Sequence, residues 1–197
     1  VDVRLRPDGA KGLLVSSLAS FGEYQRQRAW TWEHQALVRA RGIVGDAGLL
    51  AAFDALRGEV LAVPRDAMQL SIDVATMRRK MRTELDRSDA AWFDLKQGDG
   101  GLVDLEFLLQ CLVLRDAHAC PRLLEARGTP ALLEIVREIG SLDSGCVDAL
   151  REAHALLLDK GLRCTLDRRP RGAPQDDAPL ASAREAVRSA LGSIGLV

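Results

Sequence analysis

The run from residue 102 to residue 118 constrains the fold of this chain more than any other segment. It reads LVDLEFLLQCLVLRDAH and is apolar on nearly all sides. A helix without a polar face is stable only when other elements surround it. The run therefore predicts a buried central helix with further helices packed around it. A chain of 197 residues, 47% of them hydrophobic, is long enough to build one such core.

The other helices are predicted from apolar spacing and from capping residues. Leu70, Val74, Met77 and Met81 recur every three or four residues, which indicates a long amphipathic helix with Pro64 in its first turn. The segment 168–177 combines proline, glycine and charge and is predicted to be a loop. The chain shows no strand signal after residue 15. The expected helices are 18–28, 31–41, 46–62, 64–85, 102–118, 129–140, 144–166 and 180–194.

The first seven residues, VDVRLRP, have the alternation of a β-strand, with Asp2, Arg4 and Arg6 on one face. The apolar segment 13–15 could pair with this strand as a hairpin. Charges on one strand face are costly to bury without partners. The face is therefore either a solvated edge or part of a site that holds metal and phosphate, and the residues alone leave both open. Because the strand begins at residue 1 without a start methionine, the chain is expected to be a fragment.

Composition narrows the class of protein. The net charge of −1 disfavours non-specific nucleic-acid binding, which needs a basic surface. No apolar run approaches the roughly 20 residues of a membrane span. The four cysteines form no CxxC pair and, with the three histidines, complete no zinc pattern. A reducing cytoplasm suits such cysteines best.

A first motif, AWTWEHQALVRAR, covers residues 29–41. Two tryptophans at the start of a helix most often serve packing. Glu33 and Arg41 could support an active site indirectly, by holding the residues that contact the substrate. His34 is more often a structural hydrogen-bonding group than a catalyst.

A second motif, FDLKQGDGGLVDLEF, covers residues 93–107. Its glycines precede a helix start, where a phosphate could approach free N–H groups and Lys96 could add a positive charge. Asp104 and Glu106 fall in the first turns of that helix, where its dipole favours negative charge. Glu106 lies among apolar residues, so it is expected to need an arginine or N–H partner that would join this helix to a neighbour.

The three segments 1–9, 29–41 and 93–107, in this order, resemble the bacterial glutamine synthetase adenylyltransferase family. Members of that family have two related nucleotidyltransferase halves, one adding AMP from ATP and the other removing it by phosphorolysis. The spelling AWTWEHQALVRAR resembles the adding half. A departure lies in residues 153–158, AHALLL, where the family more usually has a tyrosine followed by an arginine.

The resemblance implies a mainly α fold. Residues 1–64 would be the remnant of an α+β nucleotidyltransferase domain, and residues 65–197 an antiparallel helical bundle. Asp2 would be the third carboxylate of the catalytic triad and a Mg²⁺ ligand, the first two lying upstream, so the isolated chain is expected to be inactive. The other roles that we assign on this basis are phosphate or substrate contacts for Arg4, Arg6 and Lys96, and support or structure for Glu33, Arg41, Asp94, Asp104 and Glu106.

The resemblance also implies a reaction and partners. Mg²⁺ would orient ATP, a tyrosine hydroxyl of glutamine synthetase would attack the α-phosphorus, and pyrophosphate would leave. The implied partners are glutamine synthetase, the PII signal protein and glutamine as effector, in the cytoplasm, with neither nucleic acid nor membrane. Two alternatives remain: a related uridylyltransferase that modifies PII, and a non-catalytic helical module that docks PII or glutamine synthetase.

Overall fold

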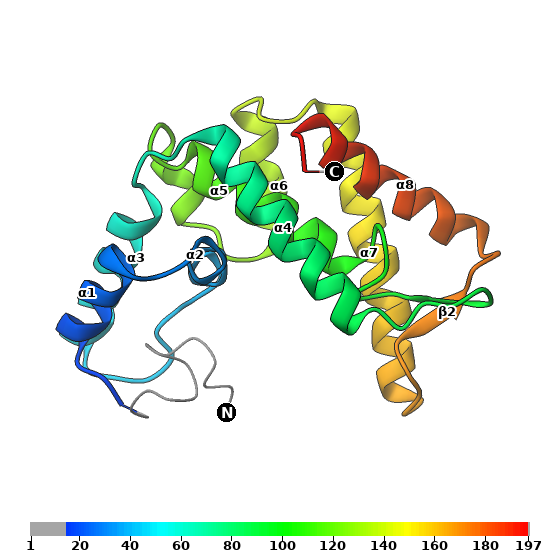
Figure 1. The fold of residues 1–197 in the computed structure, drawn as a ribbon, viewed down its shortest axis with the longest axis horizontal. Helices are drawn as coiled ribbons and strands as arrows, with labels where there is room; N and C mark the ends of the chain where they lie inside the picture. Colours follow the sequence, from blue (N-terminus) through cyan, green and yellow to red (C-terminus); the bar gives the residue numbers. More distant parts are fainter. Residues whose placement is uncertain (1–14, 197) are drawn as a thin grey trace.

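A computed structural model describes residues 15–196 of the chain. Figure 1 shows helices α1 to α3 at one end, a small sheet at the other, and the remaining helices between them. This arrangement confirms the mainly α class. The helices of the described part are α1 (Leu18–Gln27), α2 (Thr31–Val38), α3 (Ala47–Leu61), α4 (Ala67–Leu85), α5 (Leu102–Asp116), α6 (Thr129–Glu138), α7 (Ser144–Leu166) and α8 (Ala178–Ser193).

Short polar residues set the starts of most helices. The Asp143 carboxylate accepts a hydrogen bond from the N–H of Cys146 and starts α7 at the residue expected from the sequence. The start of α4 was predicted wrongly. Pro64 lies before the helix, which begins at Ala67 because Asp66 caps it through the N–H of Gln69.

The end of α2 also differs from the prediction, since the helix stops at Val38 and not at Arg41. Its last carbonyl groups have a partner outside the helix. The buried guanidinium of Arg57 donates to the oxygens of Leu37, 2.9 Å away, and Val38, 2.5 Å away. Helix ends leave such carbonyls without partners inside the helix. Burial lowers the pKa of Arg57 to about 10, a value that still leaves it charged near neutral pH.

Helix α5 forms the centre of the core, as its sequence predicts. It packs against α2, α4, α6, α7 and α8. Burying the apolar side chains of α5 stabilises the fold by about 25 cal/mol per Å² of apolar area removed from water. The buried residues of α5 are Val103, Asp104, Leu105, Phe107, Leu108, Leu109, Gln110, Cys111, Leu112, Val113 and Leu114.

A two-stranded antiparallel sheet was not predicted. Strand β1 (Trp92–Asp94) pairs with β2 (Gly172–Pro174), with Phe93 opposite Ala173. Strands of three residues are too short to show a period-two pattern, and this pair joins segments about 80 positions apart in the chain. The sheet replaces part of the loop expected over 168–177 and fastens the end of α7 to the segment before α5.

Three further predictions meet the structure in different ways. The hairpin expected from the segments before residue 15 lies outside the described residues. The domain boundary at residue 64 stays a prediction, although α2 packs on both α4 and α5 within one core. In the described part, no helix is long and apolar enough to cross a membrane, and all four cysteines are free thiols.

Candidate functional site

The residues with the most specific predicted roles are Asp2, Arg4 and Arg6. All three lie outside the described residues. Their roles in catalysis, metal binding and phosphate binding therefore stay predictions. What the structure describes is the scaffold that carries the other two motifs.

Glu33 fastens α2 to α1. Its carboxylate is buried and accepts hydrogen bonds from the hydroxyl of Tyr24 and from the N–H of Trp30, both at 2.8 Å. A buried carboxylate with two donors is well satisfied. The contact observed for Glu33 is thus structural, and it fixes the start of the tryptophan-rich helix.

His34 has partners on both ring nitrogens. Its Nε2 lies 3.0 Å from the carbonyl oxygen of Gln25, and its Nδ1 lies 3.4 Å from the guanidinium of Arg65. Burial lowers the pKa of His34, with Arg65 lowering it further against the opposing effect of the Gln25 carbonyl. These contacts agree with the structural reading of this histidine. Arg41 lies exposed in the loop after α2.

Glu106 has the arginine partner expected for it. Arg39, directly after α2, forms an ion pair with its carboxylate. This pair joins α2 to α5, as the sequence led us to expect. It is half-exposed, however, with exposed side-chain fractions of 49% for Arg39 and 33% for Glu106.

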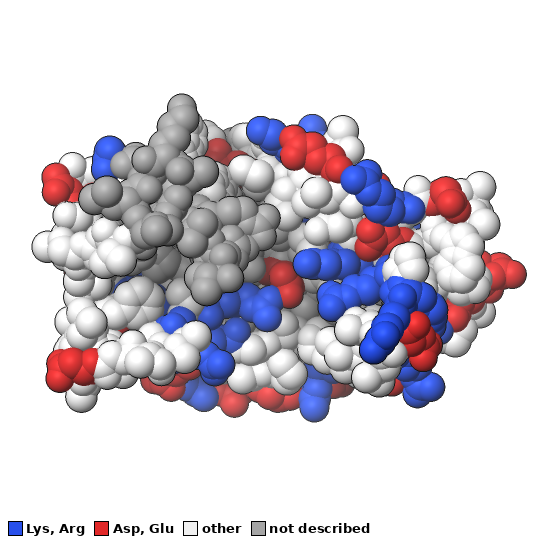
Figure 2. Space-filling view, turned by 90° about the horizontal axis from the view of Figure 1, so that it is seen from below, with Lys and Arg blue, Asp and Glu red and all other residues white. Residues whose placement is uncertain are grey.

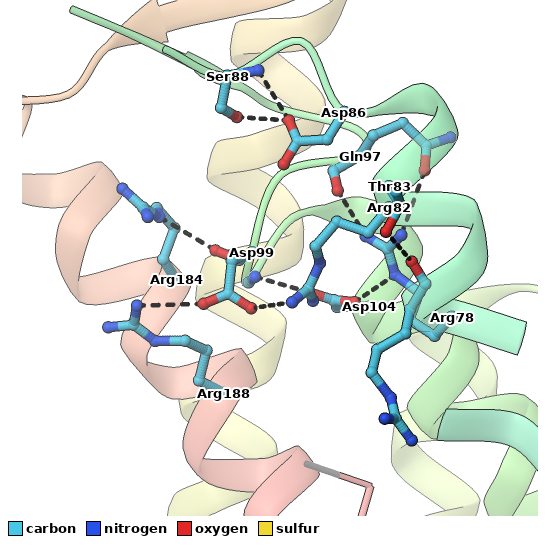
Figure 3. Close-up of polar contacts among 12 residues, drawn as sticks. Arg78, Arg82, Thr83, Asp86, Ser88, Gln97, Asp99, Asp104, Arg184 and Arg188 are labelled. Atoms are coloured by element: carbon cyan, nitrogen blue, oxygen red, sulfur yellow. Dashed lines mark hydrogen bonds and ion pairs between the residues drawn. The ribbon is translucent and has the colours of Figure 1, made fainter. Parts of the chain in front are cut away.

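Asp104 is the fully buried acid of this helix. Two arginines reach it from α4: Arg78, whose Nε lies 2.5 Å away, and Arg82, whose Nη2 lies 2.8 Å away. The N–H of Gly100 donates to the same carboxylate at 2.7 Å. Figure 3 shows Arg78 and Arg82 converging on Asp104. Since a buried charge is tolerated only with this many partners, Asp104 fixes α4 against α5.

The charged contacts continue from Asp104 to α8 through Asp99. The carboxylate of Asp99 pairs with Arg82 at 2.7 Å and with Arg188 at 3.4 Å, and its carbonyl accepts from Arg184 at 3.2 Å. Three helices therefore meet at one chain of alternating charges. We call Arg78, Arg82, Asp99, Asp104, Arg184 and Arg188 the charge junction. The junction was not predicted from the sequence, in which its visible signal is the spacing of one helical turn between Arg78 and Arg82.

The glycine-rich segment before α5 was expected to offer free N–H groups to a phosphate. In the structure these groups are engaged: the N–H of Gly98 donates to the oxygen of Asp94, and that of Gly101 to the oxygen of Gly98, both at 2.9 Å. The glycines also have a packing reason. Gly100 has a φ of +82°, and a Cβ there would lie 2.6 Å from the carbonyl oxygen of Arg184. Close contact with α8 thus accounts for Gly100.

Lys96 and Asp94 lie at a pocket on the other side of this segment. Asp94 accepts from the N–H groups of Lys96 and Gln97, at 2.8 and 2.9 Å, which fixes the turn after β1. The pocket has a volume of about 510 Å³. On the face shown in Figure 2, Lys and Arg side chains gather toward the end of the molecule that carries the sheet, with Asp and Glu side chains among them. The residues that line the pocket are Arg87, Trp92, Phe93, Asp94, Lys96, Gln97, Arg169, Pro170, Arg171 and Gly172.

The described residues contain no group of three or more His, Cys, Asp or Glu side chains that could hold a metal ion. A metal site built from three such side chains would therefore need at least one residue from outside the described part of the chain. The charge junction does not supply a metal site, because its two acids are already bound by arginines.

Comparison with known proteins identifies relatives over most of the chain. The family described as glutamate-ammonia ligase adenylyltransferase matches residues 1–56. A bifunctional glutamine synthetase adenylyltransferase/adenylyl-removing enzyme of Stenotrophomonas maltophilia (strain K279a) is 61% identical over 178 residues, which is 90% of this chain and 19% of the relative. Similarly described proteins of Xanthomonas axonopodis pv. citri (strain 306) and Shewanella loihica are 60% and 47% identical, over 87% and 91% of this chain and 18% and 19% of their own lengths.

These relatives are all described as adenylyltransferases, and the chain is similar to one segment of each. More narrowly, the chain belongs to the glutamine synthetase adenylyltransferase family over the segment that it shares with these relatives. The chain spans about one fifth (19%) of the length of the relatives from Stenotrophomonas maltophilia and Shewanella loihica.

Proposed function

We propose that this chain is part of an enzyme that transfers AMP from ATP to a tyrosine of glutamine synthetase and thereby lowers its activity. The observation that carries the proposal is the identity of 61% over 90% of the chain with a bifunctional enzyme of that description. The motif of residues 29–41 supports the adding half over the removing half. The same similarity disfavours the uridylyltransferase alternative, because the relatives are described as adenylyltransferases.

In this proposal Asp2 binds Mg²⁺ and helps to accept the tyrosine proton, while Arg4 and Arg6 contact phosphate. Mg²⁺ would supply charge neutralisation at the transferring phosphate. In-line phosphoryl chemistry depends mainly on positioning and electrostatics. The metal assignment rests on Asp2 and on the family resemblance, since the described residues offer no metal cluster of their own.

Side-chain contacts join α2 to the neighbouring helices at both of its ends. Glu33 joins α2 to α1, and Arg39 with Arg57 joins its far end to α5 and α3. On the basis of the family resemblance, we assign Glu33 and Arg41 to the support of the catalytic strand. Asp94, Asp104 and Glu106 would stabilise the helical part behind it.

The remaining parts of the proposal concern partners. Glutamine synthetase would be the substrate protein, with the PII signal protein and glutamine as effectors, in the cytoplasm. The isolated chain would be inactive, because the first two carboxylates of the metal site would come from the rest of the enzyme.

The test is Asp2→Asn in an enzyme of full family length that carries this sequence. The measurements are AMP transfer from ATP to glutamine synthetase and, separately, phosphorolytic removal of AMP. Asparagine keeps the shape of the side chain but loses the charge that holds a divalent cation. We expect transfer to fall by several orders of magnitude while removal stays intact.

The matched control is Asp176→Asn, which makes the same change at an exposed position before α8. It should leave both activities unaltered. Near-normal transfer by Asp2→Asn would refute the assignment of Asp2 and favour the solvated-edge reading of the first strand. Loss of removal with transfer intact would place the chain in the other half of the enzyme.

A further inference from the structure

The pocket beside the small sheet has an unusual balance of charge. Four of its lining residues are cationic: Arg87, Lys96, Arg169 and Arg171. Its one acid, Asp94, directs an oxygen to the N–H groups of Lys96 and Gln97. Counting four positive and one negative side chains, the lining carries a formal charge of about +3 in a protein whose total is −1.

These cations come from three separate segments. Arg87 follows α4, Lys96 follows β1, and Arg169 and Arg171 follow α7. Cations after α7 have an ordinary explanation, since the end of a helix attracts positive charge. That explanation does not reach Arg87 or Lys96, which belong to other elements. Their convergence is a product of the tertiary structure.

The chain reverses sharply to bring the last two arginines to the pocket. Arg168 has a φ of +54°, a left-handed conformation that is uncommon outside glycine and costs about 1 kcal/mol or more. After this turn, Arg169 donates to the carbonyl of Gly172 at 3.3 Å and pairs with Asp167 at 3.2 Å. Arg171 donates to the Thr165 hydroxyl at 3.3 Å. Arg169 is therefore held through Nε and Nη1, and Arg171 through Nε, while each guanidinium has further N–H donors.

The pocket also has a flat apolar side. The indole of Trp92 is 49% exposed, although the residue belongs to the paired strand β1. Gly172 lies against it: a Cβ at Gly172 would be 3.6 Å from Cε3 of Trp92. Pro170 is a further apolar residue of the lining. A planar ring could stack on such a surface, because aromatic faces accept bases with little sequence preference.

From these features we infer that the pocket is a binding site for a polyanion that carries a planar ring, the chemistry of a nucleoside triphosphate. Lys96, Arg87, Arg169 and Arg171 bind the phosphates, and Trp92 stacks on the base. The volume of about 510 Å³ lies within the range of small-molecule pockets, roughly 300–1,000 Å³. The site needs no divalent cation, and it is separate from the proposed catalytic role of Asp2.

The test follows the indole N–H signal of Trp92 by NMR in the ¹⁵N-labelled 197-residue chain, with EDTA present. The chain has three tryptophans, so Trp92→Phe assigns the signal. The probes are ATP, tripolyphosphate and adenosine. We expect ATP to shift the Trp92 signal saturably with a Kd below about 1 mM. Tripolyphosphate lacks the ring and should bind about fivefold more weakly or worse, and adenosine, which lacks charge, should not saturate.

Substitutions inside and outside the pocket distinguish specific ATP binding from non-specific attraction between ATP and positive charge. Lys96→Ala and Arg171→Ala should each weaken ATP binding about fivefold or more. Lys80→Ala is the matched control, since it removes one exposed lysine of α4 that does not line the pocket. It should leave ATP binding unchanged.

Three results would overturn the inference: no saturable shift up to about 10 mM ATP, equal affinity for ATP and tripolyphosphate, or equal weakening by Lys80→Ala and Lys96→Ala. Because the experiment uses neither glutamine synthetase nor Mg²⁺, its failure would leave the proposed AMP transfer untouched. Near-normal transfer by Asp2→Asn, which would refute the assignment of Asp2, would equally leave this pocket untouched.

Discussion

Asp104 and Glu106 stand two positions apart in α5, yet they belong to two different kinds of contact. Asp104 is fully buried in the charge junction with α4 and α8, bound by Arg78, Arg82 and the N–H of Gly100. Glu106 meets Arg39 at the half-exposed contact with α2. Both contacts pair an acid with arginine, but they are expected to differ in their contribution to stability. Water screens the Arg39–Glu106 pair and is excluded from the pair of Arg78 with Asp104.

The largest expected effect comes from removing the acid of the buried contact. Asp104→Ala would leave the guanidinium of Arg78 buried without its carboxylate and the N–H of Gly100 without an acceptor. We expect a loss of about 3–5 kcal/mol in the free energy of unfolding, measured by urea denaturation.

A second variant keeps this prediction testable if Asp104→Ala does not fold. Arg78→Met combined with Asp104→Ala should cost less than the sum of the two single changes, because it removes the unpaired charge together with its partner. Additive losses, or a cost below about 1 kcal/mol for Asp104→Ala, would show that the junction is as weakly coupled as a surface pair.

The exposed contact should show a much smaller coupling. A double-mutant cycle with Arg39→Ala and Glu106→Ala is expected to give a coupling free energy below about 1 kcal/mol, because both side chains keep contact with water. The coupling should fall further at 1 M salt, where the Debye length is about 3 Å. A coupling as large as that of Asp104 with Arg78 would contradict the contrast between the two sides.

The smallest expected effect is a change in the pKa of His154 in α7, which responds to the charges of Glu106 and Arg39. Burial lowers the pKa of His154 below 6.5, while the charge of Glu106 raises it and that of Arg39 lowers it. In an NMR titration we therefore expect Glu106→Gln to lower this pKa further and Arg39→Ala to raise it. An unchanged pKa in both variants would mean that the Arg39–Glu106 pair does not act on His154.

The sign of the linked change in stability follows from the same shift. The folded state favours neutral His154, so below the ordinary pKa of 6.5 the unfolded chain binds more protons. The contribution of this group is complete above about pH 6.5 and declines as the pH falls toward the folded pKa. His34 acts in the same direction, because burial lowers its pKa as well.

The sequence predicted much of the helical framework because the signals are local. Asp143 caps the helix that directly follows it, and the apolar run of α5 is by itself enough to predict that this helix is buried. The arginine partner of Glu106 was also expected, since a carboxylate among apolar residues needs one. The sheet escaped prediction because each strand has three residues and gains meaning only from a partner far away in the chain.

The candidate site residues show the same difference between local signals, which the sequence contains, and contacts with distant elements, which it does not reveal. For Asp104 the sequence suggested only the helix dipole, and nothing local showed that Arg78 and Arg82 would meet it from another helix. The glycines before α5 suggested a phosphate cradle, whereas Gly100 permits contact with Arg184 of α8. In both cases the missing information was the position of a distant element.

The sequence by itself determined the family of this chain, its mainly helical class and the places where most helices begin, because caps, apolar periods and motifs act over a few residues. Only the tertiary structure decided which charges are buried and which surround a pocket. Burial depends on the elements that surround a side chain. Arg78 and Arg171 are the same residue type, but different elements surround them. Arg78 of α4 is buried against Asp104 of α5, whereas Arg171 lies exposed at the pocket beside the sheet.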